Sequence, residues 1–160
     1  KINVLENLVE IEYDQETKIL AIARILAISL KTSNGDAEEY INGSVLKDIG
    51  TFYKNNLLQV IKAGPVMLLC KVQPEIIHAT NNPHPMLDVG KKDDEIVLKK
   101  IYVILKGQDF ATTATGKAKF RDEMIALFGA EVEPLLKKLN LKKEQDLVAL
   151  VTELNKRHSN

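Results

Sequence analysis

An apolar run near the start of the chain constrains the fold more than any other feature. The segment "TKILAIARILAISL", residues 17–30, has apolar or small residues on nearly every side when it is drawn as a helix. A helix of that kind belongs at the centre of a domain, wrapped by other helices. Because its longest apolar stretch is 12 residues and contains Arg24 and Ser29, it is too short and too polar to span a bilayer. We expect four of its residues near the centre of the core: Ile19, Ile22, Leu26 and Leu30.

Helical spacing of apolar residues recurs along the rest of the chain. Ser44 can cap a helix, and Pro65 and Pro74 each suit the first turn of one. Residues 117–128 place apolar residues at i, i+4 and i+8 before Gly129, and a last helix is expected at 143–156. These patterns predict an all-α fold, a compact irregular bundle of seven to nine short helices. A short α-solenoid of helix pairs is the alternative.

The segment "IVLKKIYVIL", residues 96–105, allows two interpretations. Acidic residues before it and Gly107 after it favour a helix with normal ends. Its β-branched content is typical of a strand. We take it as a helix and keep the strand open.

The length and the position of turn residues set the domain organisation. A chain of 160 residues suits one domain. Residues 79–92 are rich in asparagine, proline and glycine and poor in apolar residues. We therefore predict a single helical domain over residues 1–160, with a loop at 79–92 between two halves.

The charge balance bears on the class of partner. The chain has 22 basic and 22 acidic residues, and its net charge is zero. Residues 1–90 carry 8 basic and 11 acidic residues, giving −3, while residues 91–160 carry 14 and 11, giving +3. This asymmetry is too small to predict nucleic acid or an anionic membrane as partner. If the basic half does contact phosphate, the candidates are Lys99, Lys100, Lys117, Lys119 and Arg121.

Two patterns resemble chemical sites, and each fails on spacing or surroundings. His78, His84 and Asp88 are six and four residues apart and match no standard zinc pattern. Cys70 lies in an apolar run, which disfavours the thiolate that a nucleophile needs. We therefore expect no metal, no cofactor and no catalytic residue.

The segment "ATTATGKA", residues 111–118, has the Gly–Lys pair of a phosphate-binding loop. That motif requires glycine at position 111 and serine or threonine at position 118, but this chain has Ala111 and Ala118 there. Since both positions fail, we interpret the segment as a loop that ends at a helix start.

The cysteine count and the lack of a secretory signal bear on the cellular compartment. A single cysteine excludes an intramolecular disulfide, and residues 1–160 show no secretory signal. Asn42, Gly43 and Ser44 form a glycosylation sequon, which without evidence of export is better explained as a turn and cap. We expect a soluble intracellular protein.

These observations favour a non-enzymatic helical module for protein interaction or assembly, whose partner is another protein or a second copy. The alternative is a nucleic-acid-binding helical domain that uses the lysine-rich second half. Leu147, Val151 and Leu154 form a stripe on the last predicted helix. That stripe either closes the domain's own core or contacts the partner.

Overall fold

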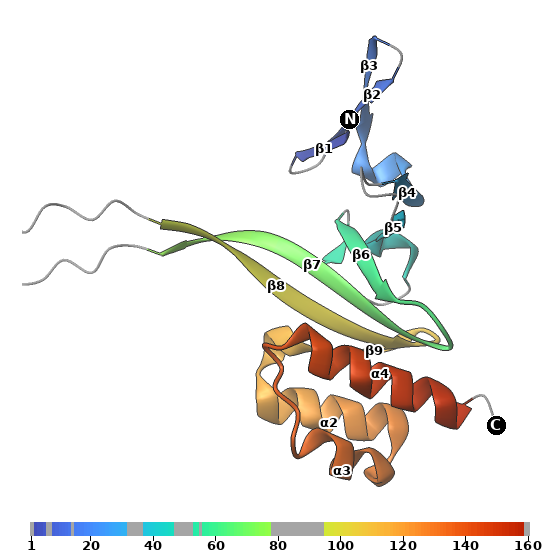
Figure 1. Ribbon diagram of the computed structural model, residues 1–160, viewed down its shortest axis with the longest axis vertical. Coiled ribbons are helices and arrows are strands. Elements are labelled where there is room, and N and C mark those ends of the chain that lie inside the picture. Colours follow the sequence, from blue (N-terminus) through green and yellow to red (C-terminus); the bar gives the residue numbers. More distant parts are fainter. Residues whose placement is uncertain are drawn as a thin grey trace, which may run out of the picture.

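Among the described residues the fold is built mainly of antiparallel strands, and the α-helices whose bounds are described lie in the C-terminal third (Figure 1). The computed structural model describes residues 2–5, 8–13, 15–31, 37–46, 53, 54, 56–77 and 95–158. The strands are β1 Ile2–Leu5, β2 Leu8–Tyr13, β3 Glu16–Ala21, β4 Ala27–Lys31, β5 Ala37–Asn42, β6 Leu57–Lys62, β7 Val66–Ile77, β8 Glu95–Lys106 and β9 Asp109–Thr112. The helices are α2 Lys117–Phe128, α3 Glu133–Leu136 and α4 Glu144–His158, with short 3-10 turns η1 Ile22–Arg24, η2 Gly43–Val45, η3 Thr113–Thr115 and η4 Ala130–Val132. The predicted all-α bundle of seven to nine helices is therefore wrong, and so is its solenoid alternative.

The strands form two antiparallel sheets in which neighbours follow one another along the chain. One sheet has the order β1-β2-β3, and the other has the order β4-β5-β6-β7-β8-β9. The longest pairing joins β7 and β8, from Val66 opposite Lys106 to Ile77 opposite Glu95. Pairing of β6 with β7 ends at Cys70, so the outer part of β7 pairs with β8 alone. This two-stranded part, residues 72–77 and 95–100, projects from the body and is called the arm below (Figure 1).

The central strands are buried on both faces. On one face α2 and α4 cover Leu68 and Ile104, with Phe120 and Met124 among the residues that they contribute. On the other face a second cluster contains Leu58, Leu69, Val103 and Tyr53. A strand enclosed on both sides is apolar at consecutive positions, which explains why "VMLLC" and "IYVIL" show no alternation.

The apolar run at 17–30 is not a central helix. It forms β3, the single 3-10 turn η1 and β4. Strand β3 pairs with β2, and strand β4 pairs with β5. Ile22 is buried, but the side chains of Ile19 and Leu26 are 64% and 72% exposed, and Leu30 is half-buried. The run contains four isoleucines, whose branching at Cβ restricts their rotamers in a helix and suits a pleated strand.

The helices predicted from Pro65 and Pro74 are replaced by the single strand β7. The helix preferred for 96–105 is also wrong, because this segment lies in β8, as its strand alternative required. Pro74 is tolerated because β7 has only one neighbouring strand at that point and therefore lies at the edge of the sheet. The predicted loop at 79–92 lies outside the described residues. The strands on either side of it pair with each other in one sheet.

The helices predicted in the last third are confirmed. Phe120, Met124 and Phe128 of α2 are buried, and Gly129, with φ of +80°, ends that helix as expected. Pro134 lies in the first turn of α3, and α4 covers the predicted range except its first residue. The spacing of their apolar residues predicted them correctly because each of these helices buries one face only, as an amphipathic pattern requires.

Candidate functional site

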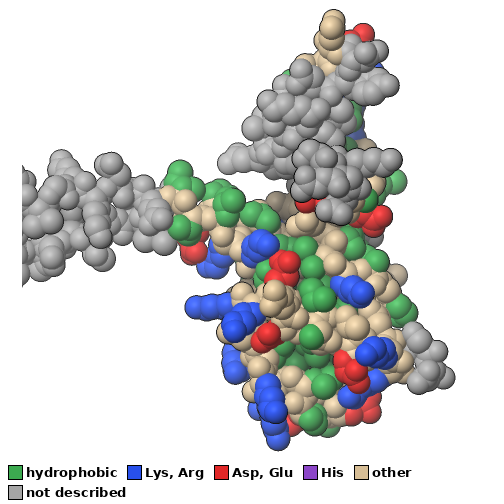
Figure 2. All heavy atoms as spheres, viewed as in Figure 1, with side chains coloured by type: hydrophobic (Ala, Val, Ile, Leu, Met, Phe, Trp, Pro, Cys, Tyr) green, Lys and Arg blue, Asp and Glu red, His purple; other side chains and the backbone are tan. Residues whose placement is uncertain are grey.

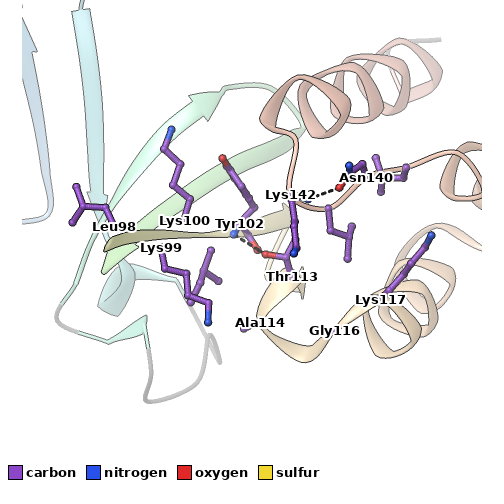
Figure 3. Close-up of a pocket in the computed structure, with 13 residues that line it drawn as sticks. Leu98, Lys99, Lys100, Tyr102, Thr113, Ala114, Gly116, Lys117, Asn140 and Lys142 are labelled. Atoms are coloured by element: carbon purple, nitrogen blue, oxygen red, sulfur yellow. Dashed lines mark hydrogen bonds between the residues drawn. The ribbon is translucent and has the colours of Figure 1, made fainter. Parts of the chain in front are cut away.

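A cleft of about 930 Å³ opens where the arm leaves the helical layer (Figure 3). Residues 98–102 of β8 form one side. The other sides come from residues 113, 114, 116 and 117 around the start of α2 and from residues 139–142 before α4. We call this site the lysine cleft, because four of its lining residues are Lys99, Lys100, Lys117 and Lys142.

The four lysines come from three separate elements, and Figure 3 shows the side chains of Lys99 and Lys100 on opposite sides of β8. Lys99 forms an ion pair with Glu75 at 3.0 Å, and Lys100 forms one with Glu144 at 3.0 Å. Within the described chain no ion pair involves Lys117 or Lys142, and no acidic residue lines the cleft. Figure 2 shows basic side chains gathered along the side of the body from which the arm projects. The cleft is therefore a region of net positive charge in a chain whose total charge is zero.

The start of α2 adds to this positive potential. Gly116, with φ of +84°, turns the chain into the helix and gives it no side-chain cap. The first turn carries Lys117 and Lys119 and no acidic residue. Because a helix N-terminus favours negative charge, two lysines there work against helix stability. Residues that oppose the local stability of a helix in this way are found most often at functional sites.

A fixed polar cluster borders the cleft. The Tyr102 hydroxyl donates to Glu144 Oε2 at 2.9 Å, and Lys100 Nζ donates to the same oxygen at 3.0 Å. The hydrogen bond from Lys100 lowers the pKa of Glu144, and burial together with Glu144 raises the pKa of Tyr102. At neutral pH the carboxylate is therefore ionised and the phenol protonated, which makes the cluster a structural clamp.

The cleft also has an apolar component. Leu139 is buried, Leu141 is half-buried and Leu98 is 72% exposed. A ligand in this cleft would therefore meet apolar side chains beside charged amines. Such a site suits a partner that is both acidic and apolar better than a simple anion.

Leu98 also belongs to an apolar surface on the arm. Residues paired across an antiparallel ladder share a face, so Val72, Pro74, Ile96 and Leu98 lie on the side of the sheet that the helices cover further along. Ile96 is 68% exposed and Val72 is 46% exposed. Apolar side chains are visible along the arm in Figure 2. We call these four residues the apolar arm face.

The structure brings together some of the residues that were predicted to contact phosphate. Lys99, Lys100 and Lys117 line the cleft, whereas Lys119 does not, and Arg121 forms an ion pair with Glu133 at 3.1 Å. Sequence reasoning missed Lys142. No local signal distinguishes it from the other lysines of that region, since its role depends on the position of the loop before α4.

The stripe predicted on the last helix lies inside the molecule. Leu147, Val151 and Leu154 are 0%, 0% and 3% exposed and belong to the main core with β7 and β8. A partner of the folded chain would therefore meet other residues.

The remaining candidates offer no reactive group within the described residues. Cys70 is buried, and burial raises the pKa of its thiol to about 11. Asn42 of the sequon is fully buried, where Nδ2 donates to the carbonyl oxygens of Ile22 and Ile25. His78, His84 and Asp88 lie outside the described residues.

In the described part of the chain, no group of three or more His, Cys, Asp or Glu residues is placed to hold a metal ion. No described helix has the length and apolar character needed to cross a membrane. Comparison with protein-family models, with curated proteins and with solved structures gave no significant match.

Proposed function

We propose that this chain is a non-enzymatic protein-interaction and assembly module that associates with copies of itself through the apolar arm face. The observation that carries the proposal is the exposure of Ile96 and Leu98, at 68% and 72%, side by side on a projecting ribbon. Isolated exposed apolar residues are common, but a contiguous apolar strip on a projection is typical of an interaction site.

The distribution of exposed apolar residues supports this proposal. Among the described residues, the large apolar side chains left exposed are Ile19, Leu20, Leu26, Val72, Ile96 and Leu98. None of them lies in α2, α3 or α4, whose apolar faces are covered by the sheet. The apolar faces of the helices and of the central strands are thus covered, whereas those of the projecting strands are exposed. A two-stranded ribbon is marginally stable alone, so covering its apolar face stabilises it.

A second copy is a partner that the chain's own charges allow. The two portions, residues 1–90 and 91–160, carry opposite net charges of −3 and +3. Because β7 and β8 belong to different portions and pair with each other, these charges do not form two separate surfaces. A total charge of zero means that no net repulsion opposes the association of two copies, whose affinity would come from apolar burial.

Nucleic acid binding is the second candidate function. It is favoured by the meeting of Lys99, Lys100 and Lys117 in one cleft. Two observations weaken it: Lys99 and Lys100 are already paired with carboxylates, and no arginine lines the cleft in the described chain. Arginine is the residue favoured for two-point contacts with phosphate.

Sedimentation velocity over a range of protein concentrations tests the proposal. We expect the wild-type chain to sediment faster as its concentration rises, and the double variant Ile96→Gln/Leu98→Gln to remain monomeric with unchanged thermal stability. Val97→Gln is the matched control, because Val97 lies between Ile96 and Leu98 on the same strand and on the opposite face of the arm. A wild-type chain that stays monomeric at every concentration would contradict the proposal.

A further inference from the structure

We infer that two copies of the chain pair β8 with β8, edge to edge and antiparallel, about a two-fold axis at Leu98. This inference rests on the proposed self-association, and it names the strand and the register through which the copies meet. The six-stranded sheet of one copy would then continue into the sheet of the other through backbone hydrogen bonds, a mode of recognition called strand addition. Both copies use the same surface, so the contact closes as a dimer.

The outer half of β8 has an unpaired edge. Strand β9 pairs with the inner end of β8 alone, and beyond it the Tyr102 amide donates to Thr113 Oγ1 at 3.0 Å. Successive residues of a strand direct their N–H and C=O groups to alternate sides, so Ile96, Leu98 and Lys100 direct theirs to the same side as Tyr102. Among the described residues, no backbone or side-chain group pairs with these three residues on that side. An unpaired edge of this kind is a template for another strand.

The other edge of the arm, along β7, is less suited to strand addition. Pro74 lies opposite Leu98 in the β7–β8 ladder. Residues opposite each other in an antiparallel ladder direct their backbone groups either toward each other or away from each other. Since Leu98 directs its groups away from β7, Pro74 lies with its backbone toward the open side, where it has no N–H to donate. Proline on an edge discourages strand pairing, so we expect the contact at β8.

The edge of β8 is complementary to itself in this register. With the axis at Leu98, the two Leu98 residues lie opposite each other, and Ile96 of each copy lies opposite Lys100 of the other. All three open backbone positions of each copy are then paired. Val97 lies opposite Lys99, so no two lysines face each other. A shift of the axis to Lys99 would place two lysines directly opposite, which is unfavourable.

The lysine cleft lies beside this edge and gives the second strand its place. Residues 98–102 of β8 form one side of the cleft (Figure 3). Opposite Lys100, Ile96 of the second copy would enter the cleft on the side of the sheet where Leu139 and Leu141 pack. Ile96 is 68% exposed in a single copy, so the contact covers an apolar side chain that one copy leaves in water. The lysines of the cleft need no acidic partner, because backbone hydrogen bonds and apolar burial supply the affinity.

Disulfide crosslinking tests the position of the axis. Leu98→Cys places two thiols opposite each other, at a Cα separation of about 5.5 Å that a disulfide can span. Ile96→Cys is the matched control: Ile96 is on the same face and similarly exposed, but its two copies would lie roughly 14 Å apart along the ladder. The native Cys70 is buried and does not compete. We expect Leu98→Cys to form a covalent dimer at least roughly tenfold faster than Ile96→Cys, with both variants melting like wild type.

Amide hydrogen exchange at low and high protein concentration tests the hydrogen bonds. The amides of Ile96, Leu98 and Lys100 should exchange roughly tenfold more slowly once about nine-tenths of the chain is associated. The amides of Val97 and Lys99 point toward β7 and pair within one copy, so their exchange should change little. This alternation along one strand is the signature of edge pairing.

Several outcomes would overturn the inference. Equal crosslinking of Leu98→Cys and Ile96→Cys would mean that the apolar arm faces stack and the edges do not pair, which would leave self-association standing and remove this contact. Failure of Leu98→Cys to crosslink in a chain that sediments as associated would do the same. Protection of the three amides that is equally strong at the lowest concentration would show that the edge is paired within one copy. A wild-type chain that is monomeric throughout would instead remove the proposed function itself.

Discussion

Tyr102 donates a hydrogen bond to Glu144 at 2.9 Å, and this bond joins the centre of β8 to the first turn of α4. Tyr102 is buried and lines the lysine cleft, so the bond fixes one wall of the cleft against another. Glu144 also lies where a helix N-terminus favours negative charge. The position of α4 over the sheet is thus set by polar contacts as well as by its buried stripe.

Glu144→Gln should lower stability in a pH-dependent way. The pKa of Glu144 is lowered in the folded state, chiefly by the hydrogen bond from Lys100. A lowered carboxyl pKa contributes stability above the unfolded-state pKa and loses it as the pH falls through the folded value. Since the Glu144 side chain is 36% exposed, we expect a cost of at most about 1 kcal/mol at neutral pH. Urea unfolding at neutral pH and at about pH 3 measures it. An equal cost at both would contradict this account.

Cys70 should be unreactive in the folded chain. Burial raises the pKa of its thiol to about 11, and the side chain is 1% exposed. At pH 8 the thiolate fraction would be on the order of one in a thousand, before burial limits access further. We expect labelling by a thiol reagent to become fast only when urea unfolds the chain. Rapid and complete labelling of the native chain would show an accessible thiol.

Gly43→Ala should destabilise the turn between β5 and β6. A Cβ at Gly43 would overlap the backbone carbonyl oxygen of Tyr53, and Gly43 N donates to Asn56 O at 2.9 Å. Because a backbone carbonyl cannot rotate away, we expect a loss of about 2 kcal/mol or more in the free energy of unfolding. Gly107→Ala is the control: it has positive φ and no neighbour within 4 Å, and should cost only about 1 kcal/mol. Similar losses for both would mean that the overlap is relieved.

Asn155→Ala should loosen the end of α4 from the sheet. Asn155 Oδ1 accepts from Val66 N at 2.7 Å and Nδ2 donates to Val66 O at 2.9 Å, so the side chain mimics a neighbouring strand. Losing both bonds leaves two backbone groups of β7 with no replacement and should cost about 1–3 kcal/mol. Lys156→Ala, one residue further on and exposed, should have little effect. Urea unfolding of both variants measures the difference, and equal stabilities would show that water replaces Asn155.

The sequence predicts the helices of the last third because each buries a single face. Phe120, Met124 and Phe128 repeat every four residues, and Gly129 marks the end. The strands could not be recognised in the same way. Residues 101–105 of β8 are buried on both faces, and a short apolar run of this kind has no period that separates strand from helix.

The candidate site was partly predictable for a related reason. Lys99, Lys100 and Lys117 were identified as a group from the basic character of the second half. Their meeting in one cleft depends on the path of β8 past the start of α2. Lys142 reaches the cleft through the loop before α4, and the exposed arm beside it depends on where β6 stops pairing with β7. Both are long-range properties that no local pattern contains.

Salt should strengthen the proposed self-association and not weaken it. The contact through the apolar arm face, with Ile96 and Leu98, depends on apolar burial, which sulfate salts strengthen. Attraction between exposed charges is instead screened within about 3 Å at 1 M salt. We therefore expect ammonium sulfate to raise the association of the wild-type chain measured by sedimentation velocity, and 1 M sodium chloride not to abolish it. The variant Ile96→Gln/Leu98→Gln should show no such gain. If sodium chloride dissociated the wild-type chain completely, the contact would be ionic and not apolar.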